Sequence, residues 1–146
     1  MKIFELSHIT LNLKVNSKEE LFGYISKKLY ELNKITDEAD FKKALFKREK
    51  EITTGMGEGV AIPHTKDISV IFPTLLYIRL EDAIEYESLD QKPVKEVFVI
   101  AMPNSYLKEH LVLLSKIADM LLKEKETLIN LKTEDEIFTL INKYSK

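Results

Sequence analysis

The 146-residue sequence contains no cysteine and no tryptophan, and only four glycines and four prolines. Without cysteine, the chain has no disulfide, no thiolate metal ligand and no cysteine nucleophile. It also lacks a long hydrophobic run, because the apolar stretch around residues 98–102 is far shorter than the ~20 residues that span a bilayer. Polar residues interrupt the N-terminal segment too early for the apolar part of a signal peptide. We therefore expect a cytoplasmic protein with no direct membrane insertion.

The chain also has no large excess of positive or negative charge. Lys and Arg total 22 against 24 Asp and Glu, a net charge of −2, so the chain has no general attraction for polyanions and we expect no nucleic-acid partner. Hydrophobic residues make up 45% and charged residues 32%, which excludes disordered and coiled-coil classes. With no internal repeat or low-complexity tract, the length predicts one domain over residues 1–146.

Helix signals recur along the chain. Capping boxes at Ser17–Glu20 and Thr133–Glu136 each place a carboxylate three residues after a hydroxyl and predict two helix starts. Apolar spacing predicts further helices over 37–48, 106–123, where Asn104 and Ser105 would form the cap, and 126–131.

Strands are predicted between these helices, over residues 8–14, 60–62, 73–80 and 97–102. Residues 97–102 are apolar without alternation, which is typical of a central strand covered on both faces. The interleaving predicts the α/β class: a single-domain, three-layer sandwich with a central mixed β-sheet flanked by helices.

Three of the four glycines lie within five residues, at Gly55, Gly57 and Gly59. This density predicts backbone positions with positive φ or a close approach to another segment. The spacing fits neither the P-loop nor the dinucleotide-binding fingerprint, because no Lys-Ser/Thr pair follows and the segment precedes a strand. A tight connection into the strand at residue 60 is the plain interpretation.

The chain has three histidines, His8, His64 and His110, separated by 56 and 46 residues, so none has local metal-ligand spacing and we expect no metal. His64 follows Pro63 at the end of a predicted strand, where an imidazole can act as base, acid or nucleophile. From the sequence pattern alone, an ordinary loop histidine is the simpler interpretation of His64, as a helix-surface histidine is of His110. We expect His8 to be structural.

Three segments together carry a resemblance that changes these odds. Residues 48–64 read REKEITTGMGEGVAIPH, residues 93–103 read PVKEVFVIAMP, and residues 108–118 read KEHLVLLSKIA. They resemble, in order, the Arg-Glu helix end with its Thr/Gly-rich loop and Pro-His terminus, the central strand, and the Glu-His-Leu helix of one family. That family is the fructose/mannitol-type enzyme IIA domains of the phosphoenolpyruvate-dependent sugar phosphotransferase system (PTS). The resemblance covers essentially the whole chain.

The resemblance implies that His64 is phosphorylated, at Nε2, with Arg48 and His110 in the active centre. Such a domain is a phosphotransferase component that takes phosphate from the phosphocarrier HPr and passes it to an enzyme IIB, here on a separate chain. It needs no cofactor, because histidine carries the phosphate covalently. Phosphoryl transfer depends on positioning and charge stabilisation, and the guanidinium fork of Arg48 suits phosphate. Loop hydroxyl and amide groups are further candidates for supporting the phosphate: Thr53, Thr54 and Gly55.

Two alternatives stay open. A nitrogen-type regulatory enzyme IIA would use the same His64 chemistry to signal to protein targets without moving sugar. A non-catalytic binding module, resembling the cytoplasmic domains of anion exchangers, would keep the fold without the reaction. A carrier needs an apolar docking patch near His64, for which Met56, Val60 and Ile62 are candidates unless they are core residues. Lys66 and Asp67 receive no role from the resemblance.

Overall fold

A mixed β-sheet lies at the centre of the computed structural model, which describes residues 2–146. Its strands are β1 (Ile9–Leu13), β2 (Gly55–Gly57), β3 (Val60–Ala61), β4 (His64–Lys66), β5 (Thr74–Ile84) and β6 (Val94–Met102). The helices are α1 (Lys18–Glu31), α2 (Glu38–Glu51), α3 (Leu107–Asn130) and α4 (Glu134–Ser145), with a 3₁₀ turn over Leu6–His8.

The strand order is β1-β5-β6-β3-β2, and β4 pairs with β6. β5 runs antiparallel to β6, β2 runs antiparallel to β3, and the remaining pairs are parallel. β3 and β4 use successive parts of the same side of β6, since Ala61 pairs with Val97 and His64 with Ile100. The prediction of a central, doubly covered strand at residues 97–102 is confirmed.

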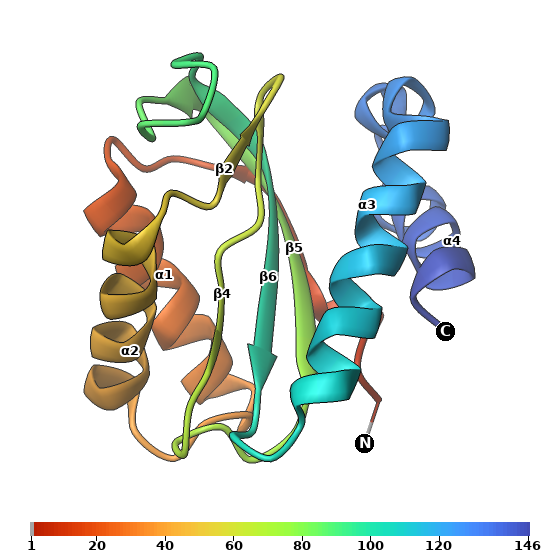
Figure 1. Cartoon of the computed structure of the whole chain (residues 1–146). Coiled ribbons are helices and arrows are strands. Elements are labelled where there is room, and N and C mark those ends of the chain that lie inside the picture. Colours follow the sequence, from red (N-terminus) through yellow and green to blue (C-terminus); the bar gives the residue numbers. More distant parts are fainter. Residues whose placement is uncertain (1) are drawn as a thin grey trace.

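Helices cover both faces of the sheet, α1 and α2 on one and α3 and α4 on the other (Figure 1). Alternate residues of β5 serve the two sides: Leu76 and Ile78 pack toward α1 and α2, whereas Leu75 and Tyr77 pack toward α3 and α4. Each buried Leu or Ile side chain stabilises the fold by roughly 1.5–3 kcal/mol. The predicted three-layer α/β sandwich with a mixed sheet is confirmed.

Both capping boxes are present. The hydroxyl of Ser17 accepts from the backbone N–H of Glu20 at 3.1 Å, and Thr133 accepts from Glu136 at 3.2 Å. The Glu20 carboxylate accepts from the N–H of Asn16, one residue before the cap. A Ser or Thr cap contributes about 1 kcal/mol, so these short motifs fix where α1 and α4 begin.

The structure corrects three of the predicted boundaries. α3 begins after Tyr106, whose side chain makes no cap hydrogen bond, so the predicted Asn104-Ser105 cap is wrong. The two helices predicted over 106–131 are one element, kinked at Glu124, where φ is −136° and ψ is 23°. The strand predicted to stop at Pro63 resumes at once as β4, because the carbonyl of Pro63 accepts from Ile100 of β6 and keeps the chain on that strand.

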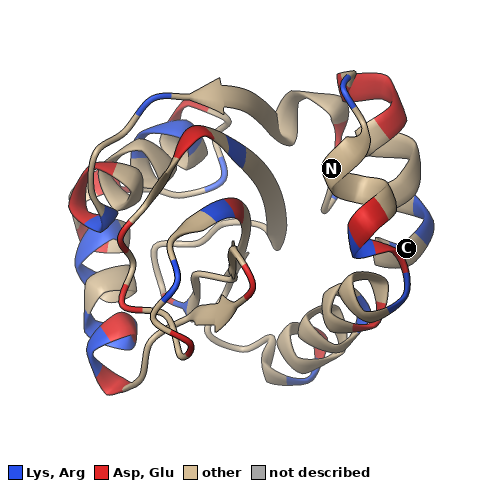
Figure 2. Ribbon diagram, turned by 90° about the horizontal axis from the view of Figure 1, so that it is seen from above, with Lys and Arg blue, Asp and Glu red and all other residues tan. Residues whose placement is uncertain are grey.

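The glycine-dense segment contains a strand that was not predicted, β2, and the turn at residues 58–59 that leads into β3. Gly57 and Gly59 have φ of 104° and 82°, and Glu58 between them also has a positive φ. Gly55 makes the close approach: a Cβ there would lie 2.4 Å from Oγ of Ser88. Positive φ and close approach are both confirmed. Figure 2 shows positive and negative residues interspersed around the molecule, with neither sign collected on one side.

Candidate functional site

A pocket lies between α2, β4 and the N-terminal part of α3, and it brings together the three residues predicted for the site. Arg48 enters from the last turn of α2, His64 from the first position of β4, and His110 from the start of α3. These residues are far apart in the sequence, so only the packing of two helical layers against opposite faces of one sheet places them in contact.

The hydrogen bonds of His64 define its tautomer. Nδ1 lies 2.6 Å from the carbonyl oxygen of Ile62, which can only accept, so Nδ1 carries the proton. Nε2 therefore keeps its lone pair and accepts from Nη2 of Arg48 at 3.3 Å. Burial, and then the charge of Arg48, lower the pKa of His64 below its ordinary 6.5 despite the hydrogen bond to Ile62. Near pH 7 the ring is neutral and offers Nε2 as a nucleophile.

Arg48 is held by the end of its own helix. Nη1 donates to the carbonyl of Ile52 at 2.9 Å, just beyond the last residue of α2. The last carbonyls of a helix lack intrahelical partners and carry partial negative charge, so a guanidinium is stabilised there. Because Nη1 is held in this way, Nη2 lies beside Nε2 of His64. In that place the guanidinium can bind an anionic group that approaches Nε2.

His110 is buried, being only 3% exposed, so the interpretation as a helix-surface histidine is wrong. Its ring lies 5.1 Å from that of His64 between centroids, at an interplanar angle of 59°. Its Nδ1 is buried and has no hydrogen-bond partner among residues 2–146. Burial, followed by His64, Lys66 and Arg48, lowers the pKa of His110 to about 4, so the ring is neutral near pH 7.

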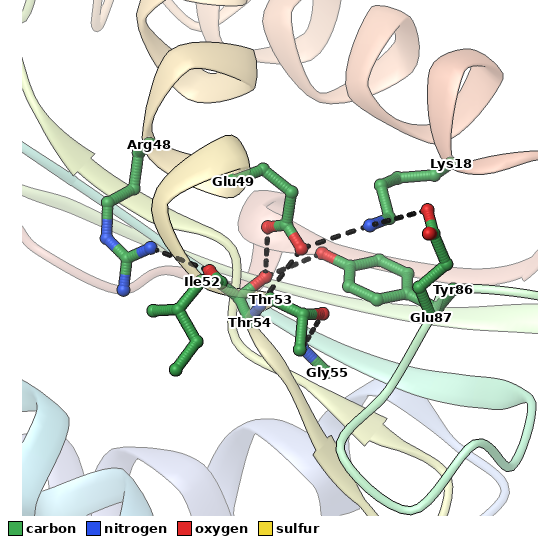
Figure 3. Close-up of polar contacts among 9 residues, drawn as sticks. All are labelled: Lys18, Arg48, Glu49, Ile52, Thr53, Thr54, Gly55, Tyr86 and Glu87. Carbon is green, nitrogen blue, oxygen red and sulfur yellow. Dashed lines mark hydrogen bonds and ion pairs between the residues drawn. The ribbon is translucent and has the colours of Figure 1, made fainter.

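The structure places Thr53, Thr54 and Gly55 beside this pocket but outside its lining. The N–H and hydroxyl of Thr54 both donate to the carboxylate of Glu49, and the N–H of Gly55 donates to the hydroxyl of Thr53 (Figure 3). Thr54 is therefore engaged by Glu49 of α2 and the N–H of Gly55 by Thr53, and direct support of a phosphate by these three residues stays a prediction.

The pocket also contains residues that the sequence analysis left without a role. Lys66 lies two residues after His64 on β4 and lines the pocket. Alternate residues of a strand share a face, so the two-residue spacing from His64 is the sequence signal that could have placed Lys66 in the site. Leu111 and Leu114 line the pocket beside His110 on α3, and their i+1 and i+4 spacing from His110 places them on adjoining parts of the helix surface.

The residues predicted for an apolar docking patch do not form one beside the pocket. Val60 and Ile62 are 3% and 4% exposed and belong to the core, whereas Met56 is exposed but outside the pocket lining. The large exposed side chains beside the pocket come from α3, where Leu111 is 58% exposed and Leu107, one turn earlier, is 56% exposed. Met56, Val60 and Ile62 were expected in the patch because they are the apolar residues close to His64 in the sequence.

Two kinds of feature are absent from residues 2–146. No helix in this range has both the length and the apolar character needed to cross a membrane. Nor does this range contain a group of three or more His, Cys, Asp or Glu side chains placed to hold a metal ion.

Comparison with known proteins gives a consistent result. Residues 2–144 match the family model described as phosphoenolpyruvate-dependent sugar phosphotransferase system, EIIA 2. The fructose-specific EIIABC component of Bacillus subtilis is 38% identical over the whole chain, which spans 24% of that protein. The fructose-specific EIIA component of Haloferax volcanii is 30% identical, covering 92% of this chain and 89% of that one. A nitrogen regulatory protein of Bradyrhizobium diazoefficiens is 40% identical, with coverages of 75% and 71%.

Two solved structures share this fold. The nitrogen regulatory protein IIA-Ntr of Neisseria meningitidis superposes with a TM-score of 0.88 at 35% identity, covering 95% of this chain and 96% of that one. The Escherichia coli IIA mannitol structure has a TM-score of 0.80 at 22% identity, with coverages of 97% and 99%, and so supports the fold. The chain therefore belongs to the EIIA 2 family of the phosphoenolpyruvate-dependent sugar phosphotransferase system.

Proposed function

We propose that this protein is a phosphoryl carrier of a fructose- or mannitol-type transporter, acting in the cytoplasm. His64 accepts phosphate from phospho-HPr and passes it to an enzyme IIB. The observation that carries the proposal is the hydrogen bond from Nδ1 of His64 to the carbonyl of Ile62 at 2.6 Å. It leaves Nε2 unprotonated in an open pocket, beside a guanidinium that can bind phosphate oxygens.

In the accepting step, the lone pair of Nε2 forms a bond to phosphorus while the bond from phosphorus to its donor atom on HPr breaks. The bonding pair leaves with HPr, and Nδ1 retains its proton. In the second step, a histidine or cysteine of enzyme IIB attacks phosphorus and the P–Nε2 pair returns to His64. Arg48 and Lys66 balance the charge spread over the transferring oxygens, and His110 can donate a hydrogen bond to them.

Two kinds of comparison support this assignment. The family match spans nearly the whole chain, and fructose-specific and mannitol-specific components are among its relatives. One neighbour of the same fold, at 20% identity, is a complex of enzyme IIAMTL and phosphorylated enzyme IIBMTL from Escherichia coli, which supports an enzyme IIB as the acceptor. Because the chain spans only about a quarter of the fructose-specific EIIABC component, sugar transport by a whole system is part of the proposal.

The test is intact-protein mass spectrometry after incubation with phosphoenolpyruvate, enzyme I and HPr, run beside His64→Ala and His8→Gln. We expect one acid-labile phosphate on the wild type and on His8→Gln, whose imidazole is buried outside the pocket. We expect none on His64→Ala. Phosphate on His64→Ala would move the acceptor elsewhere, with His110 the next candidate. No phosphate on any of them, with active HPr, would leave the binding-module alternative.

A regulatory role is the second candidate, and a specific observation favours it. The nitrogen regulatory protein of Neisseria meningitidis superposes with a higher TM-score than the mannitol structure, 0.88 against 0.80. The two functions share the accepting step and differ in the second. Rapid transfer from the phosphorylated protein to a purified fructose- or mannitol-type enzyme IIB supports the carrier, whereas a stable phosphoprotein in the presence of such enzymes supports the regulator.

A further inference from the structure

Glu49 follows Arg48 directly, but the two side chains point to opposite sides of the end of α2 (Figure 3). The Glu49 carboxylate is 6% exposed and accepts three hydrogen bonds: from the N–H of Thr54 at 2.9 Å, from the hydroxyl of Thr54 at 2.6 Å, and from Nζ of Lys18 at 3.1 Å. Two bonds to one residue make Glu49 and Thr54 a clamp across the loop that follows α2. Burial of a carboxylate is costly without a partner, and Lys18 supplies the opposite charge.

The clamp is enclosed on its far side by the buried ring of Tyr86. Its hydroxyl lies 2.7 Å from Oγ1 of Thr54, and Nζ of Lys18 lies 4.4 Å from the centre of its ring. Thr54 itself is 1% exposed. Packed in this way, the backbone at Thr54 has little freedom to move relative to α1, α2 and the sheet.

The backbone that the clamp holds in place also orients the side chains of Arg48 and His64. The carbonyl of Ile52, two residues before Thr54, accepts from Nη1 of Arg48 at 2.9 Å. The carbonyl of Thr54 accepts from the N–H of Ile62 at 2.9 Å, and the carbonyl of Ile62 accepts from Nδ1 of His64 at 2.6 Å. The hydrogen bonds of Arg48 and of His64 therefore both lead back to Thr54.

We propose that Glu49 is a positioning residue, which holds Thr54 so that the carbonyls of Ile52 and Ile62 orient Arg48 and set the tautomer of His64. The part of this claim that concerns phosphoryl transfer rests on the proposed function. Glu49 does not touch the transferring group, because it lies outside the pocket lining and its oxygens are engaged by Thr54 and Lys18. Loss of the clamp shifts two groups at once, and a misplacement of about 1 Å at a reacting centre slows reaction by about 10²-fold.

The test compares Glu49→Ala and Glu49→Gln with Glu87→Gln. Glu87 is the matched control, because its carboxylate lies 3.9 Å from the same Lys18 ammonium but is 91% exposed and does not contact Thr54. Thermal unfolding of each variant establishes that it is folded. Glu49→Gln keeps the side-chain volume and an acceptor for the N–H of Thr54, and so provides a folded variant if Glu49→Ala unfolds.

Two quantities are then measured. The ¹⁵N–¹H spectra of the imidazoles, recorded without phosphate, report the tautomer of His64, and rapid mixing with phospho-HPr gives the rate of acceptance. The wild type and Glu87→Gln should show His64 protonated at Nδ1 and equal rates. Glu49→Ala should show a mixture of tautomers and a rate about 10²-fold lower, with Glu49→Gln between the two.

The proposal requires Glu49→Ala to change both the tautomer of His64 and the rate of phosphate acceptance. A Glu49 variant that loses speed but keeps the Nδ1–H tautomer overturns the proposal, since the loss is then not transmitted through Ile62. So does a variant that loses the tautomer at an unchanged rate. If the wild type accepts no phosphate, the proposed function fails, while the tautomer spectra still decide whether Glu49 orients His64.

Discussion

His110 faces His64 across the pocket, with their ring centroids 5.1 Å apart and the rings inclined by 59°. One imidazole comes from β4, a strand of the sheet, and the other from α3. Both have pKa values lowered chiefly by burial, so both are neutral near pH 7. Two neutral rings suit an attack on phosphorus, because one provides a lone pair while the other can supply an N–H to the arriving oxygens.

Phosphorylation of His64 should raise the pKa of His110 from about 4. A phosphoryl group brings negative charge into a pocket where the charges of Lys66 and Arg48 now lower the pKa of His110, and an opposite charge nearby favours the protonated imidazole. An NMR titration of the imidazoles, with and without phosphate on the protein, measures the shift. His8 is the internal control, since it is buried against the carbonyl of Leu75. An unmoved His110 pKa would show that its ring does not contact the phosphate.

Acid should destabilise the protein before its carboxylates titrate. His8, His64 and His110 all have lowered pKa values in the folded state, whereas in the unfolded chain they titrate near 6.5. The unfolded chain thus binds more protons below pH 6.5, so stability is fully present above that pH and declines as pH falls. For His110 the decline runs from 6.5 to about 4 and is at most about 3 kcal/mol.

Urea unfolding at pH 7.5 and pH 5 measures this loss, with His110→Gln as the comparison. The variant should lose less stability between the two pH values than the wild type, because it lacks the group with the largest window. Equal losses in the two proteins would contradict the contribution of His110.

Replacement of Arg48 by Lys should slow phosphate acceptance although the charge is kept. One ammonium cannot donate to the carbonyl of Ile52 and lie beside Nε2 of His64 with the fixed fork that a guanidinium provides. We expect a reduction of roughly 10- to 100-fold, the effect of about 1.4–2.8 kcal/mol in the transition state. Single-turnover kinetics with phospho-HPr measures it. A wild-type rate would show that only the charge of Arg48 matters.

The same substitution separates charge from geometry in the pKa of His64. Arg48→Ala removes the cation that lowers this pKa and should move it upward, whereas Arg48→Lys should move it less. The NMR titration proposed for His110 also measures the pKa of His64 in both variants.

Local signals in the sequence predicted the elements of the fold well. Ser17 and Thr133 predict the helix starts because their cap hydrogen bonds join residues three apart in the sequence. Residues 97–102 predict a central strand because they are all apolar. The predictions that failed depend on longer-range contacts. Asn104 and Ser105 have the chemistry of helix caps, but the chain after β6 enters α3 two residues later, in a geometry set by packing.

The site divides in the same way. The quoted motifs contain Arg48, His64 and His110, and the folded chain brings these three residues together in one pocket. The positions of Glu49 and Lys66 in the folded chain do not follow from their residue types, since a Glu at a charged helix end and a Lys at a strand end are usually solvated. Glu49 acquires its place only because Thr54 and Lys18 meet it in the folded chain.

An acidic substitution at the rim of the pocket should weaken docking of HPr. Leu111 lines the pocket, is 58% exposed and belongs to the apolar surface of α3 beside His110. Leu111→Glu should raise the HPr concentration needed for half-maximal rate by about 10-fold or more, with a smaller effect on the maximal rate. Leu122→Glu is the matched control, because Leu122 lies on the same helix, is 88% exposed and does not line the pocket. Equal effects of the two changes would refute docking at Leu111.

Two glycine-to-alanine substitutions should shift stability in opposite directions. At Gly55 an added Cβ would lie 2.4 Å from Oγ and 2.8 Å from Cα of Ser88, so backbone must move. Overpacking of this kind costs about 1–3 kcal/mol. At Gly23, inside α1, the nearest atom is the flexible Nζ of Lys42 at 3.7 Å, and alanine should stabilise the helix by about 0.5–1 kcal/mol. Urea unfolding of both variants measures the difference, and a Gly55→Ala protein as stable as wild type would show that β2 can move away from Ser88 at no cost.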